Sequence, residues 1–406
     1  MKIGICGAGQ FAGSFIQLFN AHPLVDEVVI ADLVPERAQE TARKYNIKRT
    51  CGSMDELLTH DVDCVAIFVQ RHLHGPLTLQ ALNAGKNVYC AVPMASTMDE
   101  IKQIVKTVKE SGLVYMSGET SYYYPAALYC RERFAKGDFG QFVYGEGSYY
   151  HDMSHGFYDS FRHSGGQNWK QVAGYPPMYY PTHSISLVLS VTGSMATHVS
   201  CMGYTDREND GIFGPGKNLW DNPYSNQTAI MKTADGGVMR INEFRRVGWY
   251  GKASSNPLSI YGTKGSFEQN SCSAVWTDLN TDGHQDLWDI LDCYRHYAGG
   301  ERTGLHEVLE RDFNSQFADV HPKERLPRSF FGLTNGHLGS HQFLVDDFVK
   351  SCAQKALPPV NAWEAANYCV PGLVAHESCL RGGELLEIPD LGAPPDDWAR
   401  ADLQEN

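Results

Sequence analysis

The sequence has few of the features that mark nucleic-acid-binding or membrane proteins. It contains no run of basic residues, and its 47 Asp and Glu outnumber its 34 Lys and Arg, which gives a formal net charge of −13. Such a negative field repels phosphate backbones and anionic lipid headgroups, so nucleic acids and membrane surfaces are not expected partners. No apolar stretch approaches the roughly 18–20 residues of a membrane span, and no cleavage-type site follows the short N-terminal apolar run.

Disulfide and metal motifs are also lacking. The 11 cysteines are odd in number, scattered along the chain and never spaced as Cys-x-x-Cys. Most lie in apolar runs, which is typical of buried thiols in a reducing compartment, so we expect a cytoplasmic protein. His151, Asp152 and His155 have a spacing that suits a metal ion only on a helix. Because we expect a loop at the end of a strand here, no metal site is predicted.

Low-complexity sequence is absent too. The 39 glycines and 19 prolines are too few for it, and no internal repeat or disordered linker is evident. A hydrophobic content of 42% supplies a sizeable core. The length of 406 residues therefore predicts two compact units that share one cleft.

The first third of the chain alternates between apolar strands and amphipathic helices. The pattern predicts strands over residues 2–6, 28–31, 64–69, 87–90 and 114–116, and helices after the first strand and over 35–45, 77–84 and 98–110. Continuous apolar strands separated by such helices form a parallel sheet that is covered on both faces. Residues 1–123 are therefore predicted to be a doubly wound Rossmann domain that binds a dinucleotide.

The pattern changes beyond residue 123. Short strand-like runs bounded by turn residues cover 140–150, 196–204, 228–232, 237–244, 258–261 and 265–268. Because no helices are expected between them, they predict an open, mostly antiparallel sheet in an α+β substrate-binding domain of residues 124–406. Residues 269–339 are predicted to be irregular, and helices are predicted over 341–352 and 363–381.

The glycine turn after the first strand carries the clearest chemical signal. Gly7, Gly9 and Ala12 form a GxGxxA turn, in which the glycines allow a tight bend and the close approach of a pyrophosphate to the start of a helix. Asp32 ends the second strand, where a carboxylate accepts hydrogen bonds from the adenosine ribose hydroxyls. This combination favours NAD. Arg37 could meet a 2′-phosphate, so NADP stays a less favoured alternative.

Several segments together resemble the Gfo/Idh/MocA oxidoreductase family over nearly the whole chain. They are Ile5-Cys6-Gly7-Ala8-Gly9, Phe68 to His74, Ala84 to Val88, Val92-Pro93-Met94-Ala95 and Ile260 to Gly265. The resemblance implies an enzyme that joins a dinucleotide-binding domain to an open-sheet domain, acts on sugars or cyclitols, and forms a homodimer or homotetramer. It also places part of the chain along the nicotinamide ribose. With the glycine turn, it gives the predicted cofactor contacts: Gly7, Gly9, Gln10, Phe11, Asp32, Arg37, Val69, Gln70, His72, His74, Val92 and Trp169.

The chain departs from the usual pattern of that family in two places. The family's Glu-Lys-Pro turn is Ala91-Val92-Pro93 here, so the lysine that handles the proton of the reacting hydroxyl is missing. The position four before the family histidine, commonly Asp, is Tyr179. Both changes resemble a branch of NAD-dependent glycosidases typified by bacterial α-N-acetylgalactosaminidases. The Glu of that branch's Glu-Val-Pro turn is Ala91 here, which leaves the match incomplete.

The chemistry of such a branch needs acids and bases rather than two flanking carboxylates. Oxidation of one ring carbon by NAD makes the neighbouring C–H acidic, so that elimination can expel the glycosidic oxygen. Water then adds to the product of elimination, and the hydride returns from the cofactor to the oxidised carbon. The resemblance implies catalytic roles for His183, Tyr180, Tyr149 and Glu119. The predicted substrate contacts are His151, Arg162, Lys170 and Tyr179; Lys170 could replace the missing ammonium, and Arg162 suits an anionic sugar.

Three functions remain open from the sequence. The favoured one is a glycosidase that works by transient oxidation without net redox change. A conventional NAD(P)-dependent sugar or cyclitol dehydrogenase, with His183 or Lys170 as its base, is the alternative. The third is an NAD-binding protein without catalytic activity.

Overall fold

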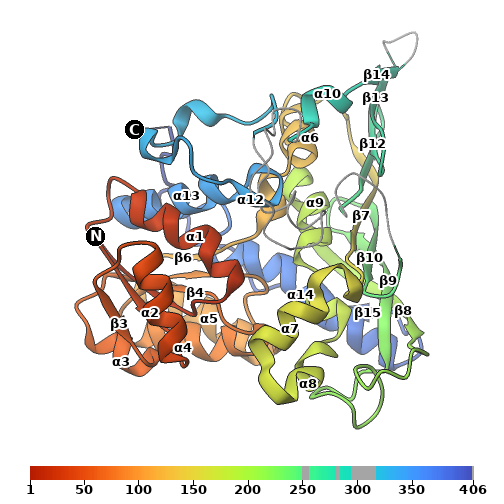
Figure 1. Ribbon diagram of the computed structural model, residues 1–406. Helices are drawn as coiled ribbons and strands as arrows, with labels where there is room; N and C mark the ends of the chain where they lie inside the picture. The colour runs from red at the N-terminus through yellow and green to blue at the C-terminus, as the bar shows by residue number, and fades with distance from the viewer. Residues whose placement is uncertain (249–255, 280–283, 294–316, 405–406) are drawn as a thin grey trace.

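The computed structural model describes residues 1–248, 256–279, 284–293 and 317–404. Two sheets organise the described chain, and helices α9 (Thr182–Thr192) and α14 (Ala362–Leu380) lie between them (Figure 1). Within the described residues, no helix combines the length and the apolar character that crossing a bilayer requires.

The N-terminal sheet confirms the predicted Rossmann fold. Its six parallel strands have the order β3-β2-β1-β4-β5-β6, in which β1 lies at the centre with β2 on one side and β4 on the other. The strands are β1 (Lys2–Cys6), β2 (Glu27–Ala31), β3 (Arg49–Cys51), β4 (Cys64–Ile67), β5 (Asn87–Cys90) and β6 (Tyr115–Ser117). Because the strands are parallel, the glycine turn and the ends of β2, β4 and β5 meet at one edge of the sheet.

Helices cover both faces of this sheet. They are α1 (Gln10–Ala21), α2 (Pro35–Lys44), α3 (Met54–Thr59), α4 (His74–Asn83) and α5 (Met98–Ser111), joined by α13 (His341–Gln354) from the far end of the chain. Phe19 of α1 and Phe348 of α13 lie in one apolar core with Tyr89 of β5. Helix α13 therefore returns the chain to the N-terminal sheet.

The second sheet is mostly antiparallel, as predicted. Its nine strands have the order β14-β13-β12-β11-β7-β10-β9-β8-β15, and among the pairings of these described strands only that of β7 with β10 is parallel. The strands are β7 (Phe142–Tyr150), β8 (Ala196–Thr205), β9 (Tyr224–Thr233), β10 (Val238–Phe244), β11 (Leu258–Gly262), β12 (Gly265–Gln269), β13 (Ala274–Asp278), β14 (His284–Asp286) and β15 (Leu386–Glu387).

Helix α9 lies directly on the inner face of β7. A Cβ atom at Gly147 would lie 1.9 Å from the backbone oxygen of Ser184, so only glycine allows this approach. The close contact brings the start of α9, with His183, beside the carboxyl end of β7.

The prediction of no helices between the C-terminal strands is wrong. Between β7 and β8 the chain forms α7 (Tyr158–Gly165), α8 (Trp169–Ala173) and α9, whereas α6 (Pro125–Ala135) precedes β7. Helix α9 is buried on nearly every side, so it lacks the polar face that would reveal it as amphipathic.

The prediction that residues 269–339 are irregular is also wrong in part. Strands β13 and β14, α10 (Trp288–Leu291) and α12 (Gly336–Gly339) lie in this range, while 280–283 and 294–316 fall outside the described residues. These elements are short, so each one gives only a weak pattern in the sequence.

Candidate active site

The glycine turn has the geometry of a phosphate cradle. Gly7 has φ +96° and donates its N–H to the Ala31 oxygen at 2.8 Å, and a Cβ there would lie 2.3 Å from the Phe68 oxygen. A Cβ at Gly9, by contrast, would meet nothing within 4 Å. Gly9 is the N-cap of α1 and offers no side-chain hydrogen bond to the first turn. The first N–H groups of the helix therefore face an open surface. These residues fit the diphosphate of a dinucleotide.

Gln10 and Phe11 form the first turn of α1. Gln10 is exposed beside the cradle. Phe11 is partly buried, with its ring centroid 5.0 Å from that of Phe15 and 5.5 Å from that of His337. The aromatic contacts of Phe11 show a packing role, and its contact with the cofactor stays a prediction.

Asp32 lies where the sequence places a ribose-binding carboxylate. Its Oδ2 accepts the Ala8 N–H at 2.9 Å and its Oδ1 accepts the Val34 N–H at 2.8 Å, so the carboxylate also holds the glycine turn in place. The Arg37 guanidinium lies 3.4 Å from Oδ1. A carboxylate has about four acceptor sites and these contacts use three, so Asp32 retains capacity for one hydrogen bond from a ribose hydroxyl.

The loop after β4 is fixed by contacts with two other segments. Gln70 Nε2 donates to the Ser164 oxygen at 2.8 Å, which attaches α7 to this loop. The His74 ring nitrogens lie 2.7 Å from the Pro93 oxygen and 3.1 Å from the Val69 oxygen, and burial lowers the pKa of His74 to about 4. His74 therefore joins the Val69 loop to the turn that contains Val92, which is buried.

Two further residues predicted along the cofactor lie in aromatic surroundings. The His72 ring is 6.2 Å from that of Trp220, and partial burial lowers the pKa of His72. Trp169 begins α8 and packs against Tyr158, with ring centroids 6.1 Å apart. Neither geometry excludes a dinucleotide, and both assignments remain predictions.

The four residues predicted to be catalytic come together at the start of α9. His183 Nδ1 lies 2.6 Å from Glu119 Oε1, and His183 Nε2 lies 3.2 Å from the Tyr180 hydroxyl. The Tyr149 ring packs on the His183 ring edge to face, with centroids 5.0 Å apart. A carboxylate, an imidazole and a phenol thus form one hydrogen-bonded chain with a second phenol beside it.

Glu119 is fully buried at the end of this chain. It precedes the short helix η2 (Thr120–Tyr123), and its Oε1 also accepts the Ser121 N–H at 2.9 Å and hydroxyl at 2.7 Å. Burial opposes ionisation, but the charge and hydrogen bond of His183 outweigh it and lower the pKa of Glu119. Glu119 both caps η2 and orients the imidazole.

Sequence reasoning missed three charged residues next to this chain. Arg71, in helix η1 (Arg71–Leu73), lies over the Tyr180 ring at 4.0 Å, and Arg245 lies over the Tyr149 ring at 4.9 Å. Arg245 pairs with the buried Glu243 at 2.7 Å. Burial raises the pKa of Glu243 to about 7 against the lowering effect of Arg245. Glu243 also accepts a hydrogen bond from Ser184 in α9.

Two of the predicted substrate residues lie next to the catalytic cluster. The His151 ring stacks on Phe157 at 3.9 Å and lies 5.5 Å from Tyr149, and burial and the charge of Arg245 lower the pKa of His151 to about 3. Tyr179 directly precedes Tyr180 in the chain, and its ring lies 4.9 Å from the ring of His376 in α14.

The other two make their contacts elsewhere. Lys170 Nζ donates to the Asp210 oxygen at 2.7 Å, in the loop after β8. Arg162 is exposed and pairs with Asp159 at 3.2 Å. These contacts give no support to Lys170 as a substitute for the missing ammonium.

The described residues contain no group of three or more His, Cys, Asp or Glu side chains that could hold a metal ion. Asp152 instead accepts the Ser154 N–H at 2.9 Å and the Val247 N–H at 2.9 Å, so it orders the turn after β7.

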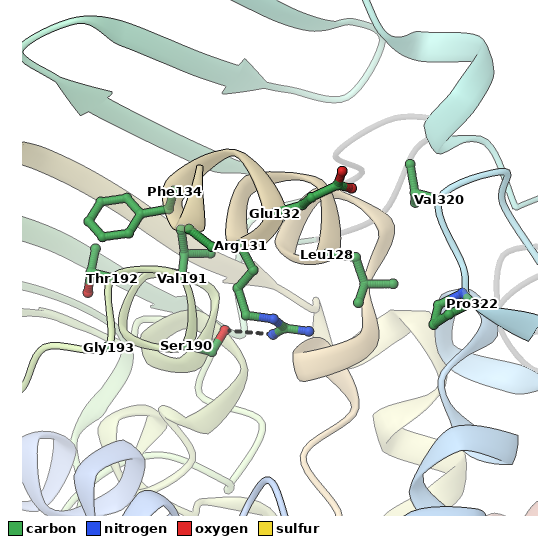
Figure 2. A pocket seen from close by; sticks show the side chains of 11 residues that line it. Leu128, Arg131, Glu132, Phe134, Ser190, Val191, Thr192, Gly193, Val320 and Pro322 are labelled. Carbon is green, nitrogen blue, oxygen red and sulfur yellow. Dashed lines mark hydrogen bonds between the residues drawn. The ribbon is translucent and has the colours of Figure 1, made fainter. Parts of the chain in front are cut away.

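Two hollows are seen in the described chain. A small cavity of about 10 Å³, which is room for about one water molecule, lies against Tyr180 between Arg71 and Arg245. A larger open groove of about 560 Å³ lies at the ends of α6 and α9, where Arg131 donates to the Ser190 hydroxyl at 3.3 Å (Figure 2). The larger groove shares no lining residue with the His183 cluster, whereas Tyr180 lines the small cavity, so the candidate substrate site lies around Tyr180.

The comparisons with known proteins agree with this arrangement. Residues 1–119 match the family model of the Gfo/Idh/MocA oxidoreductase family, NAD-binding Rossmann fold, and residues 131–379 match its C-terminal alpha/beta domain. The chain therefore belongs to the Gfo/Idh/MocA oxidoreductase family. The predicted class, an enzyme of this NAD-binding family, is confirmed.

Individual relatives include both glycosyl hydrolases and dehydrogenases. A glycosyl hydrolase family 109 protein of Streptomyces filamentosus is 23% identical over 96% of this chain and 77% of its own length. A mouse trans-1,2-dihydrobenzene-1,2-diol dehydrogenase is 30% identical over 38% of this chain, and the match spans only 47% of that enzyme. A levoglucosan dehydrogenase complex with NADH shares the fold, with a TM-score of 0.73 at 18% identity, covering 96% of this chain and 99% of that one.

Proposed function

We propose that the protein is an NAD-dependent glycosidase that oxidises a sugar hydroxyl transiently, eliminates the glycosidic oxygen and regenerates the hydroxyl. The observation that carries this proposal is the buried Glu119–His183–Tyr180 chain beside a turn in which Val92 replaces the lysine of ordinary dehydrogenases. The match to a glycosyl hydrolase family 109 protein over 96% of the chain supports the same reading.

The cofactor would be held at the carboxyl edge of the parallel sheet. The backbone of Gly7 and Gly9 would face the diphosphate, and Asp32 would accept the ribose hydroxyls. Arg37 is paired with Asp32, which supports NAD over NADP. When bound, NAD supplies a hydride acceptor that returns the hydride at the end of the cycle.

The catalytic residues handle the protons of the reaction. The proton of the reacting hydroxyl would pass by way of the Tyr180 hydroxyl to His183 Nε2, while Glu119 holds Nδ1 and stabilises the imidazolium that forms. Tyr149 would take the proton from the carbon next to the oxidised one. The guanidinium of Arg245 lies over the Tyr149 ring at 4.9 Å and places a positive charge beside this phenol.

A conventional NAD-dependent sugar dehydrogenase is the second candidate. The same carboxylate, imidazole and phenol chain is sufficient to remove a hydroxyl proton, and this observation favours it. The fold of levoglucosan dehydrogenase is consistent with either function, because fold alone does not define activity.

A screen of aryl glycosides with and without added NAD separates the two candidates. Release of the aglycone with no net rise in absorbance at 340 nm supports the glycosidase, whereas NADH that accumulates in proportion to a free sugar supports the dehydrogenase. His183→Ala and Tyr180→Phe should each reduce turnover at least tenfold. Full turnover in both variants would remove the proposed site.

A further inference from the structure

The substrate cavity beside His183 is rich in aromatic rings and positive charge. Its lining combines Arg71 and Arg245 with the rings of Phe157, Tyr175 and Tyr180, and includes no acidic residue among the described ones. This is unusual for a chain with a net charge of −13. The cavity therefore presents a local positive field within an acidic protein.

The two arginines of this cavity differ in their partners. Arg245 lies 2.7 Å from the buried carboxyl group of Glu243. Arg71 has its guanidinium carbon 5.1 Å from the Phe157 ring, 5.9 Å from the Tyr175 ring and 4.0 Å from the Tyr180 ring. Within the described residues the interactions of this guanidinium are with ring faces, and none is an ion pair with a carboxylate.

Two other arginines of the chain are paired with carboxylates. Arg246 pairs with Asp206 and Asp210, and the buried Arg325 pairs with Asp346 and Asp347. A guanidinium carries five N–H donors, and leaving them without acceptors in a partly closed cavity is costly. The donors of Arg71 thus suit an acceptor that comes from outside the chain.

The shape of Arg71 favours a carboxylate as that acceptor. Rings that stack on a guanidinium cover its faces and leave the N–H groups at its edge, where a planar carboxylate can accept two parallel hydrogen bonds. Tyr180 lies under this guanidinium and also contacts His183 Nε2 at 3.2 Å. A sugar whose carboxylate is bound by Arg71 would therefore have its ring next to the proton-handling chain.

We propose that the substrate is a sugar acid and that Arg71 binds its carboxylate. The reaction in this inference rests on the proposed function, whereas binding of the acid rests on the position and ring contacts of Arg71. It also moves the predicted anion-binding role from Arg162, which is exposed and paired with Asp159, to Arg71.

Binding and turnover test this proposal separately. Glucuronate, N-acetylneuraminate, glucose and glucose 6-phosphate are titrated calorimetrically into the NAD-loaded protein, and aryl glucuronide and aryl glucoside are compared as substrates. A sugar acid should bind at least tenfold more tightly than glucose and than glucose 6-phosphate. Equal affinity for acid and neutral sugars, or a preference for the phosphate, would overturn the proposal even if turnover is seen.

Variants at Arg71 assign the effect to one side chain. Arg71→Gln should lower the acid-to-neutral affinity ratio ten- to one-hundred-fold, and Arg71→Lys should restore only part of it, because the ammonium keeps the charge but not the fork. The matched control is Arg133→Gln, which removes an arginine that lies over Trp276 and pairs with Asp138 outside the cavity. It should leave the ratio unchanged.

Two results separate this proposal from its alternatives. If Arg71→Gln raises the Kd for NAD as much as that for the sugar acid, Arg71 serves the cofactor and the proposal is wrong. If a sugar acid binds through Arg71 but no glycoside or sugar is turned over, the proposed function fails while the carboxylate site stands.

Discussion

Replacing Glu119 by glutamine tests the proton-handling chain with the smallest change in shape. Glu119 is fully buried and its Oε1 lies 2.6 Å from His183 Nδ1. Because the charge of His183 lowers the pKa of Glu119 despite burial, the carboxylate is ionised throughout the neutral range. Glu119→Gln keeps the side-chain volume and removes the charge that stabilises an imidazolium.

The expected loss follows from the energy of that contact. Hydrogen bonds to charged groups contribute about 1.5–3 kcal/mol, which corresponds to roughly a ten- to one-hundred-fold loss in kcat. The KM for the sugar and the Kd for NAD should change less than about threefold, because in the proposed site Glu119 touches neither the sugar nor the cofactor.

Initial rates on the best aryl glycoside and NAD titration by protein fluorescence give these quantities, with circular dichroism as the check on folding. Glu146→Gln is the control, since it makes the same chemical change at a partly exposed carboxylate that pairs with Arg240 on the other face of the second sheet. Wild-type kcat in Glu119→Gln would refute the role of the carboxylate. A parallel rise in the Kd for NAD would assign Glu119 to the cofactor instead.

Three further predictions address the cofactor site and the buried charges. Gly7→Ala should weaken NAD binding more than tenfold and lower the melting temperature, because its Cβ would lie 2.3 Å from the Phe68 oxygen at φ +96°. Asp32→Asn should raise the Kd for NAD about tenfold in the same fluorescence titration, because the proposed hydrogen bond from the ribose would lose its charged acceptor. Burial raises the pKa of Glu243 from its ordinary value of 4.5 to about 7, so between these pH values the folded state holds a proton that the unfolded state releases. The free energy of unfolding should therefore fall as pH rises from 4.5 to 7, by up to about 3 kcal/mol, and urea denaturation should show that Glu243→Gln lacks this slope.

The dinucleotide-binding fold could be predicted because its strands are continuously apolar and its glycine turn is local. Strand β3 was missed, since three residues, Arg49 to Cys51, give no periodicity. Helix α9 shows the opposite limit: burial on nearly all sides removes the polar face that marks a helix in sequence.

The candidate catalytic cluster was predicted through the family resemblance, and its charged surroundings were not. Glu243 follows Met239 and Ile241 at alternate positions of β10, so an acid at the third inward position was a readable sign of a buried carboxylate. Arg71 gave no comparable signal, because its ring contacts come from elements that lie far apart in sequence.

Deuterium incorporation tests the transient-oxidation mechanism most directly. Hydrolysis of an aryl glycoside in D₂O by the NAD-loaded protein should place solvent deuterium on the product carbon next to the oxidised one, with no accumulation of NADH. A product that carries no deuterium at that carbon, or NADH formed in proportion to product, would contradict the account.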